Sequence, residues 1–155
     1  MKRIMILFCL ILLSCNGQKR QELPKTELYK NLIGKWKVIE SNITPFEHIS
    51  YCDKLDLLSI FEFDKYGVLR VYENEKNKNN CNEYQTFKIE DSKINIWEHD
   101  FGFDYQILKL DSDSLILKTD RILSYQYESK ELKDFNNKII DSISEKGMII
   151  KMIKI

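Results

Sequence analysis

Residues 57–73 have the sequence LLSIFEFDKYGVLRVYE, in which two apolar runs flank a polar turn. Its two halves, Leu57–Phe63 and Val68–Glu73, are short apolar runs rich in the β-branched and aromatic residues that favour strands. Between them, Asp64-Lys65-Tyr66-Gly67 has the composition of a tight turn, because Gly67 can adopt the positive φ that such a turn needs. The stretch therefore predicts a β-hairpin.

The chain on both sides of this hairpin repeats the same arrangement of short strands and polar turns. The further predicted strands are Ile33–Ser41 before it and Glu83–Ile89, Ile94–Glu98, Phe103–Leu110, Leu115–Thr119 and Ile122–Glu128 after it. Tight polar turns join most consecutive strands, which is typical of an up-and-down meander. A meander of eight strands removes its two exposed edges by closing. The sequence therefore predicts an all-β fold, an eight-stranded up-and-down barrel.

The period of the pattern changes after residue 128. Apolar residues at spacings of three and four predict an amphipathic helix, and they are Leu132, Phe135, Ile139, Ile140 and Ile143. Gly147 is a suitable stop for this helix. Met148–Ile155 then predicts a final short apolar strand. We expect the helix and this strand to cover the outside wall of the barrel and to pair with an exposed edge.

The N-terminus has the features of a signal peptide. Lys2 and Arg3 precede ten apolar residues, 4–13, a run that is too short to span a bilayer. Leu12-Leu13-Ser14-Cys15 resembles the lipobox of bacterial lipoproteins, in which the cysteine becomes the lipidated first residue of the mature chain. We therefore expect a signal peptide at 1–14, a lipidated Cys15 with a polar tether at 15–30, and the barrel domain at 31–155. An ordinary cleaved signal with an incidental cysteine is the alternative.

These features place the protein in the cell envelope, held on a membrane by lipid. Asn16 follows the lipidation site, where an aspartate would mark inner-membrane retention in enteric bacteria, so the outer membrane is favoured. The sequence does not indicate whether the protein is on the periplasmic face or the surface face of that membrane. The tether ends in a short helical turn predicted over Thr26–Asn31.

Four cysteines are present, and only two of them belong to the folded domain. Cys9 leaves with the signal peptide and Cys15 is acylated, so Cys52 and Cys81 remain as an even pair in an oxidising compartment. We predict that they form a disulfide; two free thiols are the alternative. No cysteine or histidine spacing indicates a metal site, and no cofactor is expected.

Composition and motifs point away from nucleic-acid binding and from catalysis. Lys and Arg number 24, as do Asp and Glu, so the chain lacks the basic footprint of a nucleic-acid-binding protein. The two histidines, His48 and His99, fall in predicted loops without a nucleophile motif nearby. We expect no enzyme, with a hydrolase or isomerase built on the same barrel as the alternative.

Three motifs resemble the lipocalin-like domains of bacterial lipoproteins, especially those of Bacteroidetes. They are Gly34-Lys35-Trp36, the run FEFDKYG at 61–67, and the run YQILKLDSDSLIL at 105–117. The resemblance covers about residues 30–128 and implies a barrel in which Trp36 plugs the closed end beside Gly34. In that family a basic residue from the last strand lies over the tryptophan, and Arg121 is the closest candidate by position.

Aromatic residues recur along the predicted strands and could point into the barrel. The candidate ligand-binding residues are Phe61, Phe63, Tyr72, Phe87, Trp97, Phe103, Tyr105 and Tyr125. They could line an apolar cavity or fill the barrel completely. The first reading predicts a membrane-anchored lipocalin-like lipoprotein that binds a small apolar ligand in the barrel. The second predicts a protein-interaction lipoprotein, such as an inhibitor, an immunity protein or an envelope assembly factor, whose partner is an envelope protein.

Overall fold

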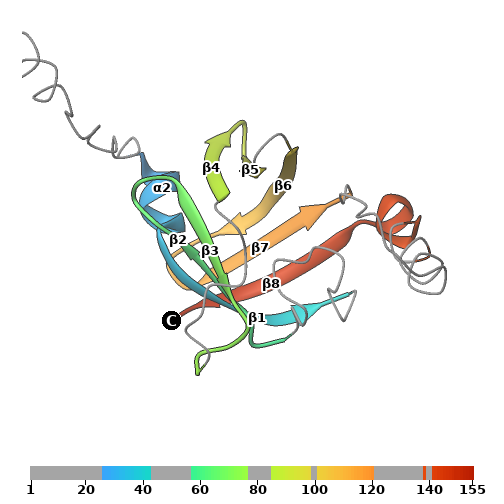
Figure 1. The fold of residues 1–155 in the computed structure, drawn as a ribbon, viewed down its shortest axis with the longest axis horizontal. Coiled ribbons are helices and arrows are strands. Elements are labelled where there is room, and N and C mark those ends of the chain that lie inside the picture. The colour runs from blue at the N-terminus through green and yellow to red at the C-terminus, as the bar shows by residue number, and fades with distance from the viewer. Residues whose placement is uncertain (1–25, 43–56, 77–84, 99–100, 121–137, 139–140) are drawn as a thin grey trace, which may run out of the picture.

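The computed structural model describes residues 26–42, 57–76, 85–98, 101–120, 138 and 141–155. Its eight antiparallel strands form a closed barrel in chain order, with the last strand beside the first (Figure 1). The strands are β1 (Gly34–Ser41), β2 (Ile60–Phe63), β3 (Val68–Tyr72), β4 (Gln85–Glu90), β5 (Lys93–Glu98), β6 (Phe101–Leu110), β7 (Ser114–Thr119) and β8 (Met148–Lys154). The predicted eight-stranded up-and-down barrel is confirmed.

The final strand of the chain closes the barrel. β8 pairs with β7 on one side and with β1 on the other. Its inward residues Met148, Ile150 and Met152 are buried and alternate with outward ones, which is the pattern of a strand that buries one face. The expected place of this strand outside the barrel is therefore corrected. The strand predicted at Ile122–Glu128 lies outside the described residues.

The β2–β3 hairpin is confirmed, and its turn is held by one carboxylate. Asp64 Oδ1 accepts hydrogen bonds from the backbone N–H groups of Tyr66, at 2.8 Å, and Val68, at 2.9 Å. Gly67 has the expected positive φ of 77°. β2 begins at Ile60 rather than at Leu57, because Leu58 also has a φ of 77°, a conformation that no strand residue adopts.

A short helix covers one end of the barrel. α2 (Glu27–Leu32) begins after Thr26, whose side chain accepts from the backbone N–H of Tyr29, as is usual at a helix N-cap. Tyr29 and Leu32 are the buried residues of this helix. The Tyr29 hydroxyl accepts a hydrogen bond of 2.8 Å from the backbone N–H of Ile89 in β4. The predicted helical turn before the barrel is thus confirmed, and it is tied to the wall.

The other end of the barrel is closed by the helical residues 141–146, which lie opposite α2 in Figure 1. Ile143 from this segment is buried in the same apolar cluster as the barrel interior. The segment stops at Gly147, as predicted, with a φ of 75° and an N–H that donates to the Ile143 carbonyl at 2.7 Å. Within the described residues, no helix is long and apolar enough to cross a bilayer.

Candidate functional site

The end of the barrel next to α2 is built around Trp36. The indole is fully buried, and its Nε1 donates a hydrogen bond of 2.7 Å to the carbonyl of Leu32. Lys154 Nζ lies 5.0 Å from the centre of the Trp36 ring and donates to the carbonyl of Asn31 at 2.8 Å. A Cβ on Gly34 would stand only 2.9 Å from Lys154 Cε, so the glycine leaves room for this lysine.

The structure thus places Lys154 over Trp36, a position for which Arg121 was the sequence candidate, and the role of Arg121 stays a prediction. Arg121 itself lies outside the described residues. Trp36 is directly paired with Lys154 across β1 and β8, which places the cation over the ring. The sequence did contain a signal, since Lys154 is the last cation of the final strand. It was missed because that strand was not expected inside the barrel.

Four of the eight candidate aromatics meet inside the barrel. Phe61, Phe63, Phe87 and Tyr105 are each 1% exposed and belong to one apolar cluster, which also contains residues from both end helices. Phe63 and Phe87 pack edge to face with ring centroids 5.0 Å apart, a favoured aromatic geometry. These four residues therefore pack in the apolar core of the barrel.

The other candidates are not gathered with them. Tyr72 and Trp97 lie on the outer wall, Phe103 lies in β6, and Tyr125 is outside the described residues. The cysteines of the predicted lipid anchor and disulfide, Cys15, Cys52 and Cys81, are also outside the described residues, as are His48 and His99. The predicted anchor and disulfide stay predictions.

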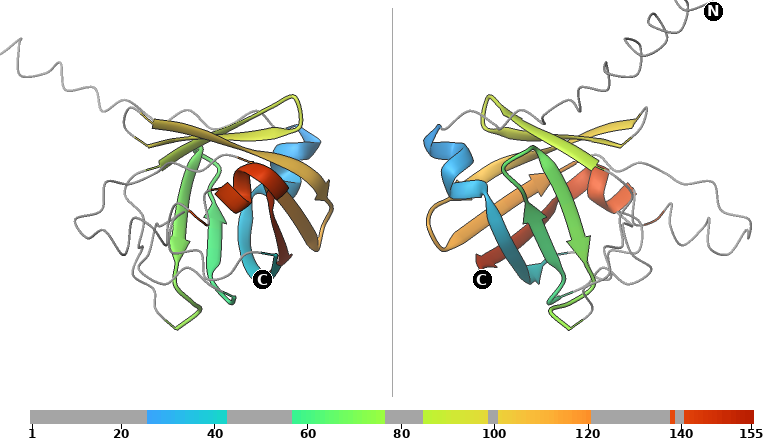
Figure 2. Two further views of the ribbon diagram at one scale, coloured as in Figure 1. Left: turned by 90° about the vertical axis from the view of Figure 1, so that its right-hand side faces the viewer. Right: turned by 60° about the vertical axis from the view of Figure 1, so that its left-hand side comes forward.

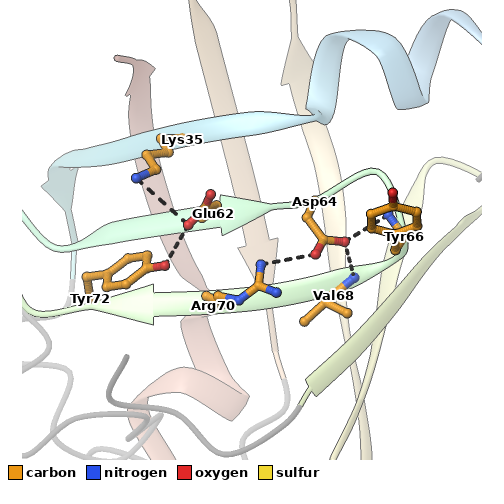
Figure 3. Close-up of polar contacts among 7 residues, drawn as sticks. All are labelled: Lys35, Glu62, Asp64, Tyr66, Val68, Arg70 and Tyr72. Carbon is orange, nitrogen blue, oxygen red and sulfur yellow. Dashed lines mark hydrogen bonds and ion pairs between the residues drawn. The ribbon is translucent and has the colours of Figure 1, made fainter. Parts of the chain in front are cut away.

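The outer face of β1, β2 and β3 carries a ladder of polar contacts (Figure 3). The Tyr72 hydroxyl donates a hydrogen bond of 2.6 Å to Glu62, and Lys35 Nζ lies 3.9 Å from the same carboxylate. Arg70, which is paired with Glu62 across the hairpin, has its Nη1 3.0 Å from Asp64 Oδ2. Burial, followed by the Glu62 carboxylate, raises the pKa of Tyr72 from 10.0 to about 12. The ladder holds the hairpin against β1.

Tyr72→Phe is expected to remove a phenol that ionises near pH 12, seen as a loss of late amplitude in an absorbance titration of tyrosinate. Because the folded pKa of Tyr72 is raised to about 12 above its ordinary 10.0, its contribution to stability is present up to about pH 10 and is lost as the pH rises toward 12. Glu62→Gln should lower the pKa of Tyr72. If the wild type and Tyr72→Phe differ only by a phenol that ionises near pH 10, and not above pH 11, the pKa of Tyr72 is not raised.

A hollow of about 560 Å³ opens at the rim of the barrel where the β2–β3 hairpin meets β1. We call it the rim hollow. Figure 2 shows β1, β2 and β3 side by side in its right-hand view. The described lining residues are Lys37, Leu57, Leu58, Glu73, Asn74, Glu75 and Lys76. The volume lies within the usual range of small-molecule sites, roughly 300–1,000 Å³.

The rim hollow combines an apolar edge with a polar wall. Leu57 and Leu58 are 46% and 56% exposed. On the other side, Lys37 Nζ lies 2.7 Å from Glu75 Oε1. The hydrogen bond from Lys37 and its charge lower the pKa of Glu75, which favours its carboxylate form. Such a site can hold a molecule with both an apolar part and a polar group.

No pattern in the sequence indicates this hollow. Leu57 and Leu58 belonged to a predicted strand, where their apolar side chains would have alternated between the two faces. The positive φ of Leu58 turns the chain out of the sheet instead, and its N–H donates to the carbonyl of Val38 at 2.8 Å. Nothing in the residue type of Leu58 indicates that conformation, which is a clear outlier for a bulky side chain.

Comparison with protein-family models, curated proteins and solved structures gives no match. Among the residues that the structure describes, no three side chains of His, Cys, Asp or Glu gather as they would around a metal ion.

Proposed function

We propose that this protein is a lipid-anchored, lipocalin-like binding protein of the cell envelope, and that it holds a small amphiphilic ligand in the rim hollow. The anchor rests on the lipobox-like run ending at Cys15. The binding role rests on one observation, the hollow of about 560 Å³ with two exposed leucines at its edge.

The packing of the interior supports this place for a ligand over the inside of the barrel. Phe61, Phe63, Phe87 and Tyr105 are almost completely buried by one another and by their neighbours. A ligand there would have to displace closely packed side chains, and protein interiors have little free volume to give. The rim hollow needs no such rearrangement.

The backbone of Leu58 supports the same conclusion. A leucine with a φ of 77° carries strain of about 1–3 kcal/mol, and such strain concentrates at binding and active sites. The hydrogen bond to Val38 keeps the residue in this conformation. The strain places an apolar side chain, which stability alone would bury, at the edge of an open hollow.

Leu58→Asn tests the rim hollow. Asparagine tolerates a positive φ, so the fold should keep or gain stability. Loss of a leucine that a ligand covers should weaken binding of the probe dansyl-undecanoate by about tenfold or more, since burying such a side chain is worth roughly 1.5–3 kcal/mol. The measurement is a fluorescence titration of residues 16–155.

The matched control is Leu108→Ser, because Leu108 is 47% exposed on β6, away from the hollow. Its titration should equal that of the wild type. Equal loss of binding in both variants, or none in Leu58→Asn, would remove the rim hollow as the site.

Native mass spectrometry of the exported chain tests the proposal without a chosen probe. An extra mass that is lost on denaturation is expected, and the denatured mass of the full chain should show lipid on Cys15. The second candidate function is that of a protein-interaction lipoprotein. It is favoured by the close packing of the aromatic side chains inside the barrel. A bare native mass, together with recovery of one stoichiometric envelope protein, would replace the first candidate by the second.

A further inference from the structure

Trp97 lies on the outer wall of the barrel and is 38% exposed. It was expected inside, and the rim hollow does not use it. In the sheet its direct neighbours are Thr86 on β4 and Gly102 on β6. The indole of Trp97 therefore has only the small residues Thr86 and Gly102 beside it in this cross-strand row.

The next row on the same face is made of polar side chains. Lys88, Asn95 and Asp104 are paired with one another across β4, β5 and β6. Adjacent strands lie about 4.8 Å apart, so the three side chains span roughly 10 Å. The row offers an ammonium, an amide and a carboxylate, which together can both donate and accept hydrogen bonds.

Among the described side chains of this wall, the charges balance. Lys93 lies 3.1 Å from Asp104, and Lys88 and Glu90 supply one further charge of each sign. A face without net charge attracts neither anions nor cations strongly. An uncharged ligand with many hydroxyl groups matches it best.

We propose that this wall binds a neutral pyranose ring of an oligosaccharide. We call the site the Trp97 platform, and it consists of Thr86, Lys88, Asn95, Trp97, Gly102 and Asp104. The negative face of an indole attracts the C–H groups on the flat side of a sugar ring. In the neighbouring row, Asp104 accepts from its hydroxyl groups beside the ion pair with Lys93, and Asn95 Oδ1 accepts as well. Asn95 Nδ2 donates to Glu90 Oε2 at 3.4 Å.

Lys88 takes part as a movable cover. Its Nζ lies 5.8 Å from the centre of the Trp97 ring, a weak cation–π contact at an exposed site. A sugar ring displaces this ammonium from the ring face and can receive a hydrogen bond from it. The site is shallow and lies on a convex wall, so binding is weak, on the order of 1 mM in dissociation constant.

Affinity electrophoresis of residues 16–155 tests the platform. The native gels contain one neutral polysaccharide each: mannan, galactan, xylan or a mixed-linkage glucan. At least one should retard the wild type, and Trp97→Ala should lose the retardation. Asp104→Asn should weaken binding severalfold, and Trp97→Phe should keep part of it.

A matched control is Tyr66→Ala. Tyr66 is likewise exposed, at 40%, and has a lysine over its ring, Lys65 at 5.0 Å, but it lies in the β2–β3 turn. Its retardation should equal that of the wild type, as should that of Leu58→Asn, because the rim hollow is a separate site.

Trp97 could instead serve only to cover the backbone beside Gly102. That role predicts that Trp97→Ala lowers the melting temperature while migration stays the same in gels with and without polysaccharide. This result, or a wild type that no member of the panel retards, overturns the proposal.

Discussion

Trp36→Ala is expected to lower the free energy of unfolding by about 3–5 kcal/mol, the usual cost of removing a large buried aromatic side chain. The indole is fully buried at the end of the barrel covered by α2. Its loss leaves a cavity, frees the carbonyl of Leu32 from its hydrogen bond, and removes the ring beneath Lys154. The measurement is guanidinium-induced unfolding followed by circular dichroism.

Trp97→Ala is the matched control, because it makes the same change at the only other tryptophan of the chain. Trp97 is part of the outer wall, so its removal should cost less than about 1 kcal/mol. A loss in Trp36→Ala as small as the one expected for Trp97→Ala would mean that Trp36 does not seal the barrel as described.

Local sequence chemistry was sufficient to predict most of the barrel. The turn at Asp64–Gly67 requires a carboxylate that accepts backbone N–H groups and a residue that tolerates positive φ, and both are visible in the residue types. The stop at Gly147 depends on the same freedom of glycine. The seven strands β1 to β7 could be predicted because most of the turns between them lie between two alternating runs.

Pairing between distant strands could not be read in the same way. The final strand closes the barrel because its inward face, Met148, Ile150 and Met152, fits between β7 and β1. The order of strands along the chain does not show whether a strand after a helix returns to the sheet. Without that pairing, Lys154 could not be placed over Trp36.

The candidate site was predicted only in part, for two different reasons. Trp97 and Tyr72 could have been placed on the outer wall, because they alternate with the inward residues Ile96 and Val71. The conformation of Leu58 could not, since a leucine at positive φ is fixed by its tertiary surroundings. Whether the aromatics fill the barrel also depends on how the two end helices pack, which no single strand reveals.

Ile143→Ala is expected to cost about 2–5 kcal/mol, because it removes a buried aliphatic side chain from the second closed end. Ile143 is 1% exposed and belongs to the cluster of the barrel interior. Its carbonyl also accepts the N–H of Gly147, which starts the turn into β8. The helical residues 141–146 thus cover this end of the barrel and lead directly into β8, the strand that closes it.

Guanidinium unfolding measures this cost, and Ile153→Ala is the control, since Ile153 is 37% exposed on β8 and should change stability by less than about 0.5 kcal/mol. Hydrogen exchange adds a local readout. If Ile143 holds this end of the barrel closed, the backbone amides of β8 near Met148 should exchange faster in Ile143→Ala than in the wild type. The amides near Lys154, beside Trp36, should keep their protection relative to the rest of the barrel. If the free energy of unfolding and the amide exchange rates are the same in Ile143→Ala and in the wild type, residues 141–146 do not close this end of the barrel.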